Sequence, residues 1–135
     1  MRYAMRVVLA VLAVGLLLGS RPVVAHHAFA AEFDSEKPVK LTGAVTKLEW
    51  TNPHAWIYVD VKDETGTVTN WGFEMASPNG LMQSGWTRFS LKPGDVVTVE
   101  GSRAKNGSSR ANATTVTLAS TGERLFAGAN PNQQP

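Results

Sequence analysis

The sequence predicts a small all-β fold with one short helix, closed into a five-stranded barrel. After residue 38 nearly every segment alternates apolar and polar residues with a period of two, which is typical of half-buried strands. A single helix-start signal, Ser77-Pro78, stands between the third and fourth expected strands. A β-sandwich of similar strand content is the alternative. We favour a barrel because closing the sheet removes edges that so small a protein could not otherwise cover.

The first 25 residues are predicted to be a Sec signal peptide. Arg2 and Arg6 precede an unbroken apolar run over residues 7–19, which is too short to span a bilayer, and small residues at 23–25 suit cleavage before His26. Two other cleavage sites are possible. Cleavage after Ala30 would remove both His26 and His27. Cleavage after Val24 would make His27 the third residue of the mature chain, which resembles the amino-terminal copper and nickel motif of albumin-like peptides. We expect export to the periplasm or secretion.

The remaining 110 residues suit one domain with a single core. We expect an extended N-terminal arm over residues 26–38, a barrel over residues 39–126 and a flexible tail over residues 127–135. Residues 39–50 form a long first strand whose apolar phase slips near residues 43–47, which predicts a β-bulge. Residues 55–61 and 67–75 complete a meander, with Trp56 and Tyr58 on the face opposite the aliphatic one.

The second half of the chain supplies the helix and two more strands. The helix is expected to begin at Ser77-Pro78 and to end near Ser84, where Gly85 stops it. Strands follow over residues 96–103 and 111–120. Three strands, a helix and two strands is an order that resembles the OB-fold, a small barrel whose surface often binds ligands.

Three runs also carry a family resemblance: His-His-Ala-Phe-Ala-Ala-Glu-Phe-Asp at 26–34, Thr-Asn-Pro-His-Ala-Trp at 51–56 and Trp-Gly-Phe-Glu-Met-Ala-Ser-Pro at 71–78. Residues 26–126 thereby resemble an uncharacterised family of small exported bacterial proteins, catalogued as a domain of unknown function. The resemblance implies export and a small β-domain, and it implies no activity.

Charge and cysteine content exclude several classes of function. The three arginines of the signal account for the basic balance, so the mature chain holds 10 basic and 11 acidic residues, a net charge of −1 with His neutral. A basic footprint for nucleic acid is therefore absent. The chain has no cysteine, and so no disulfide, thiolate metal site or lipidated anchor. We expect no membrane anchor after processing.

The three histidines, His26, His27 and His54, are the predicted metal ligands. A terminal amine with its own imidazole and a second imidazole resembles the histidine brace of copper proteins, and nitrogen ligands suit Cu(II). The 13-residue arm can fold back to His54 over at most about 45 Å. The alternative is an unstructured arm and a turn histidine that caps a carbonyl. Further candidate ligands are Glu32, Asp34, Met75 and Met82, although the methionines are better explained as packing residues.

A second hypothesis places a non-metal ligand or an unknown protein partner on the aromatic face of Trp56 and Tyr58, since OB barrels often stack ligands on aromatic rings. Trp50 and Trp71 are expected in the core, and Glu74 in solvent. Arg103, Lys105 and Arg110 make a basic loop, which is usually a solvated hairpin tip. No hydrolase or phosphate-loop motif occurs, so the prediction is a binding module rather than an enzyme. A copper redox enzyme is the third and weakest hypothesis.

Overall fold

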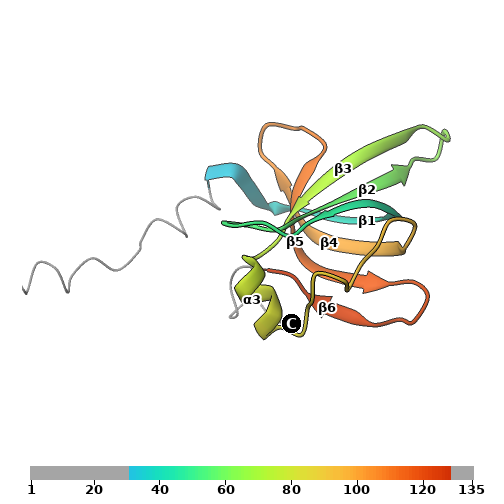
Figure 1. Ribbon diagram of the computed structural model, residues 1–135. Coiled ribbons are helices and arrows are strands. Elements are labelled where there is room, and N and C mark those ends of the chain that lie inside the picture. Colours follow the sequence, from blue (N-terminus) through green and yellow to red (C-terminus); the bar gives the residue numbers. More distant parts are fainter. Residues whose placement is uncertain (1–30, 129–135) are drawn as a thin grey trace, which may run out of the picture.

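The computed structural model describes residues 31–128, which form a small barrel of six strands and one short helix (Figure 1). In chain order the elements are β1 Phe33–Glu49, β2 Trp56–Lys62, β3 Val68–Glu74, α3 Pro78–Gln83, β4 Val96–Ala104, β5 Arg110–Leu118 and β6 Arg124–Phe126. Within these residues, no helix is both long and apolar enough to cross a membrane.

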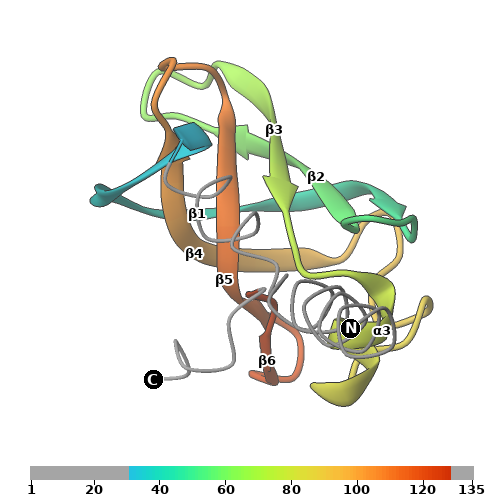
Figure 2. The ribbon, with the colours of Figure 1, turned by 90° about the vertical axis from the view of Figure 1, so that its left-hand side faces the viewer.

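The sheet closes on itself in the predicted OB-like manner. The strand order is β3-β2-β1-β4-β5-β6, and a parallel pairing of β3 with β5 closes the ring. All other pairings are antiparallel. Figure 2 shows the strands crossing around the barrel, with α3 beyond one end of β3. The expected all-β fold with one helix is confirmed, and β6 is an extra strand that the sequence did not predict.

Strand β1 is longer than expected at its N-terminal end. The residues predicted as the second half of an extended arm are part of it, because Phe33 is buried and pairs with Ala104 of β4. The register then shifts between Asp34 and Pro38, an irregularity that tolerates a proline lacking a backbone donor. The predicted bulge is confirmed by a second register shift, between Val45 and Lys47 in the pairing with β2.

The core follows the predicted alternation. Ala55, Ile57 and Val59 of the second strand region are fully buried, as are Phe73 and Met75 of the third. The tryptophans differ from the expectation, because Trp50 and Trp71 are only partly buried against the core. Both side chains pack against the outside of the buried core, so part of each indole stays exposed.

The fully buried tryptophan is instead Trp86, which follows α3. Its indole Nε1 donates a hydrogen bond of 2.8 Å to the carbonyl oxygen of Phe126. Ser77 caps α3 as predicted, accepting a hydrogen bond of 3.2 Å from the Gly80 amide. Ala127, predicted as the start of the tail, is buried and hydrogen-bonded to Ala76 and Thr114. The ordered domain therefore includes it, and residues 129–135 lie outside the described part.

Candidate functional site

The loop between β1 and β2 brings His54 against a carboxylate of β3. Immediately before β2, the Ala55 amide donates to the Ala76 carbonyl at 3.1 Å, and the Met75 amide donates to the Ala55 carbonyl at 2.9 Å. Trp56 pairs directly with Glu74, so His54 and Glu74 are diagonal neighbours on the outer face. The His54 Nδ1 and the Glu74 Oε1 are joined by a hydrogen bond, which becomes an ion pair when the imidazole is protonated.

Burial distinguishes the two partners. The Glu74 side chain is only 14% exposed, whereas that of His54 is 38% exposed. Burial raises the pKa of the Glu74 carboxyl, and His54 partly offsets this by lowering it. The expectation that Glu74 is a solvated charge is therefore wrong. The alternating pattern along β3 correctly predicted that the Glu74 side chain faces outward. It could not show that the loop between β1 and β2 would cover this side chain.

The hydrogen bond fixes which ring nitrogen of His54 can act as a ligand. An ionised carboxylate only accepts hydrogen bonds, so Nδ1 carries the proton. In the neutral ring Nε2 then keeps its lone pair, and it has no hydrogen-bond partner among residues 31–128. A histidine that donates from one nitrogen to a carboxylate and presents the other is the usual arrangement of a metal-ligating histidine.

A shallow pocket of about 370 Å³ lies beside this pair. Its walls come from the end of β1, the following loop, and the facing positions of β2 and β3: Glu49, Thr51, Asn52, Pro53, His54, Trp56 and Glu74. The Asn52–Pro53 peptide bond in this loop is cis. The pocket thus combines one imidazole, two carboxylates and an indole.

The other two predicted metal ligands, His26 and His27, lie outside the described residues. Within residues 31–128, no three His, Cys, Asp or Glu side chains are grouped so that they could hold a metal ion. The barrel on its own therefore presents His54 with Glu74 but not a complete metal site. Any copper site of the predicted kind requires the N-terminal histidines.

The chain enters the barrel close to this pair. The Glu32 carboxylate is near enough to contribute to the raised pKa of Glu74, and the Glu32 carbonyl accepts a hydrogen bond of 2.9 Å from the Lys105 amide. His27 precedes Glu32 by five residues, which span at most about 18 Å when extended. The distance along the chain therefore permits an N-terminal histidine to reach the outer face near His54.

The two residues predicted as a ligand platform do lie together. The rings of Trp56 and Tyr58 are stacked with their centroids 6.5 Å apart and their planes 21° apart. Gly72 of β3 is opposite Tyr58 and has no side chain, and a Cβ there would lie 3.4 Å from the Tyr58 ring and 3.8 Å from the Trp56 ring. Both rings therefore lie within van der Waals contact distance of the Cβ position at Gly72.

Charged groups border these rings. The Arg110 guanidinium lies 4.7 Å from the centroid of Trp56, and the Lys47 ammonium lies 5.8 Å from that of Tyr58. Lys47 also forms an ion pair with Glu49, whose second oxygen accepts a hydrogen bond of 3.3 Å from the Tyr58 hydroxyl. Arg110 is thus not only part of a solvated hairpin tip.

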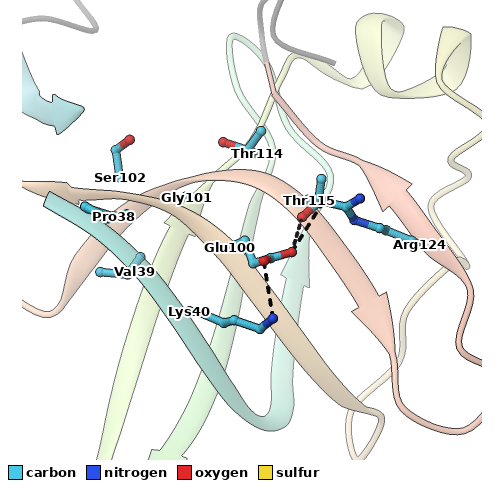
Figure 3. Close-up of a pocket in the computed structure, with 9 residues that line it drawn as sticks. All are labelled: Pro38, Val39, Lys40, Glu100, Gly101, Ser102, Thr114, Thr115 and Arg124. Atoms are coloured by element: carbon cyan, nitrogen blue, oxygen red, sulfur yellow. Dashed lines mark hydrogen bonds and ion pairs between the residues drawn. The ribbon is translucent and has the colours of Figure 1, made fainter. Parts of the chain in front are cut away.

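A second pocket, of about 430 Å³, lies over β1, β4 and β5 (Figure 3). Figure 3 shows the Glu100 carboxylate between three donors: the Thr115 hydroxyl at 3.0 Å, Lys40 Nζ at 3.5 Å and Arg124 Nη2 at 3.5 Å. These contacts, with the Thr115 hydrogen bond first, lower the pKa of Glu100. The carboxylate therefore already has three partners within the barrel.

The remaining candidate ligands are placed away from His54 or differently engaged. Asp34 is 3.7 Å from Lys37 Nζ and accepts a hydrogen bond from the Glu36 amide. Met75 is fully buried in the core, and Met82 of α3 is 54% exposed. Met75 is therefore a core residue and Met82 a surface residue, in line with the expectation that neither methionine is a metal ligand.

The chain belongs to DUF6152, a family of unknown function, whose model matches residues 13–113. This confirms that the chain belongs to an uncharacterised family, whereas export and the start at His26 stay predictions. No curated protein and no solved structure matches the sequence significantly. The family supplies no activity, so function has to be argued from the outer face of β1, β2, β3 and β5.

Proposed function

We propose that the mature protein is an exported, non-catalytic binding module that holds Cu(II) with His26, His27 and His54. One observation carries the proposal: His54 is held through Nδ1 by the largely buried Glu74 carboxylate, and Nε2 has no partner among the described residues. Orientation by an outer carboxylate is what a metal-ligating imidazole needs. In this proposal the amine and imidazole of His26 supply further nitrogen ligands.

The chemistry of the pocket favours a divalent cation that prefers nitrogen. Neutral imidazole and amine nitrogens bind Cu(II) more tightly than the other divalent first-row ions. The partly buried carboxylate of Glu74 adds negative charge beside the imidazole, which stabilises a bound cation. No thiolate is available, so the set of donors is unlike the sites that select Cu(I).

The proposal is tested on protein exported by its own signal, after intact mass has established the mature N-terminus. A chain that begins at His26 should bind one equivalent of Cu(II) tightly in a competition titration. His54→Ala should weaken the binding by at least about tenfold, because it removes one imidazole from the ligand set. Glu49→Gln, which alters a pocket carboxylate that does not contact His54, is the matched control and should retain the affinity.

Two results would overturn the proposal. One is a mature chain that begins after Ala30 and therefore lacks both N-terminal histidines. The other is a chain that begins at His26 but binds copper equally well with and without the His54 imidazole. In the second case the metal would be held by the N-terminal peptide alone, and the barrel would have no part in the site.

A further inference from the structure

The first half of β3 is a free edge of the sheet, which we call the β3 edge. β5 pairs with β3 only at residues 72–74, so residues 68–71 have β2 on one side and, within residues 31–128, no strand on the other. Figure 1 shows that this half of β3 lies in the hairpin that extends from the barrel. We infer that two copies of the protein associate through this edge as an antiparallel, two-fold pair. The inference is independent of the proposed copper site, because it requires neither the N-terminal histidines nor a metal.

The backbone of β3 shows which peptide groups the β3 edge presents. The Gly72 amide donates a hydrogen bond of 3.1 Å to the Ser109 carbonyl, on the side away from β2. The register with β2 runs without a shift from residue 68 to residue 74, so the peptide groups alternate between the two sides of the strand. Val68 and Asn70 therefore direct their N–H and C=O groups to the β3 edge, where no strand of the described part of the chain pairs with them.

These groups select one register for a two-fold pair. When two copies are centred on Thr69, Val68 of each lies opposite Asn70 of the other, and each of these two pairs exchanges two hydrogen bonds. A pair centred on Asn70 is poorer, because Val68 would then face Gly72, whose amide is already bonded to Ser109. The pairing centred on Thr69 also covers Val68, which is 56% exposed.

The β3 edge lacks the protection that a second free edge, on β1, has. Over the residues before Gly43, β1 has β4 as its only strand neighbour within residues 31–128. That stretch carries charged side chains and a proline, which commonly block edge-to-edge pairing: Glu36, Lys37, Pro38 and Lys40. Residues 68–71 are Val-Thr-Asn-Trp, with no charge and no proline. The β3 edge is therefore open to another strand.

Charge favours a second copy as the source of that strand. The hairpin residues 60–67 carry three carboxylates and one lysine, and Glu64 at the tip is exposed and forms no ion pair within residues 31–128. Residues 103–110 carry three cations and no carboxylate, and Ser109 among them lies beside Gly72 at the far end of the β3 edge. Antiparallel pairing therefore brings the acidic tip of each copy towards the basic loop of the other, a complementarity that favours this partner.

The register makes a crosslinking test specific. The chain has no cysteine, so one introduced cysteine per copy can form a protein disulfide only between copies. Thr69 lies opposite Thr69 of the second copy in a non-hydrogen-bonded pair, with Cα atoms about 4.5 Å apart, which a disulfide can bridge. Thr67→Cys is the matched control, because in the same register the two positions 67 are about 14 Å apart along the strands.

The mature, metal-free protein is incubated in a chelator with oxidised glutathione. Each protein disulfide forms by thiol–disulfide exchange, in which the two thiols are oxidised and glutathione disulfide is reduced to two thiols. Thr69→Cys should give the covalent dimer at least about tenfold faster than Thr67→Cys at equal concentration, because only the first pair meets the geometry of a disulfide.

Sedimentation equilibrium of the cysteine-free protein tests the pair without a crosslink. The edge is short, so association should be weak, and the average mass should rise from monomer towards dimer with concentration. Val68→Pro should weaken association at least about tenfold, because it removes one donor from each copy at a position where an edge tolerates proline. Glu64→Lys should also weaken it. Glu123→Lys, the same change at an exposed position in the turn before β6, should not.

If Val68→Pro does not fold, as judged by circular dichroism, the comparison of Glu64→Lys with Glu123→Lys decides the question. Equal crosslinking rates for the two cysteine variants would overturn the inference, because they would indicate chance collision. A mass that stays monomeric up to the solubility limit would overturn it as well, and so would association that Glu64→Lys leaves unchanged.

Discussion

Two carboxylates on the barrel surface, Glu74 and Glu100, have opposite environments. Glu100 is surrounded by Lys40, Arg124 and the Thr115 hydroxyl, which lower its pKa. Glu74 is buried against one histidine, and burial raises its pKa. Glu100 has two cations and a hydroxyl around its carboxylate, as in a structural ion-pair cluster. Glu74 keeps an incompletely compensated charge beside an imidazole, which is typical of a functional site.

The largest expected difference between the two carboxylates is in copper affinity. Glu74→Gln should weaken Cu(II) binding by about 10- to 100-fold, because the neutral amide neither orients His54 nor stabilises the cation as the carboxylate does. Glu100→Gln should leave the affinity unchanged, since Glu100 lies over another part of the sheet. Competition titrations with both variants measure this contrast. Equal losses would show that the effect is one of net charge alone.

The two carboxylates should also give stability opposite pH dependences. The folded pKa of Glu74 is above its ordinary value of 4.5, so the folded state retains that proton longer, and the free energy of unfolding falls as pH rises from 4.5 through the raised pKa. The folded pKa of Glu100 is below 4.5, so its contribution is complete above 4.5 and is lost as pH falls through the lowered pKa.

Urea unfolding of the metal-free protein between about pH 3.5 and 7 measures both slopes. Relative to Glu74→Gln, the wild-type protein should lose stability as pH rises, and relative to Glu100→Gln it should gain stability. Two slopes of the same sign would contradict the contrast between the sites.

The smallest expected effect is that of the exposed cation beside Glu100. Lys40→Met should change the free energy of unfolding by less than about 1 kcal/mol, because exposed ion pairs contribute little and are screened by salt. Thr115 and Arg124 would still satisfy the carboxylate. A thermal or urea unfolding curve measures the change, and a much larger loss would mean that the cluster around Glu100 is more tightly coupled than its exposure indicates.

The period-two pattern was sufficient to predict most of the barrel. It placed Ile57 and Val59 inward, Trp56 and Tyr58 outward, and the bulge in β1, because one buried face fixes the phase of each strand. It could not predict β6, whose three residues are too few for a periodic signal. It also missed the N-terminal part of β1, since Pro38 and the irregular pairing with β4 hide the alternation.

The candidate site was predicted only in part for a related reason. His54 was identified because histidines are rare in this chain, and Trp56 and Tyr58 because they face away from the aliphatic side. The partner Glu74 was assigned to solvent, because its burial depends on the loop between β1 and β2 rather than on its own strand. The spacing of the two runs Asn-Pro-His and Trp-Gly-Phe-Glu across one hairpin was the available signal.

The most direct test of the account is pulsed electron paramagnetic resonance of the Cu(II)-loaded mature protein, compared with His54→Ala. If His54 is a ligand, the wild-type spectrum should contain modulation from the remote nitrogens of all the bound imidazoles, and in the variant this modulation should be shallower by the contribution of one imidazole. Identical spectra for the two proteins would contradict the account, because they would show that copper is bound without the histidine that Glu74 holds.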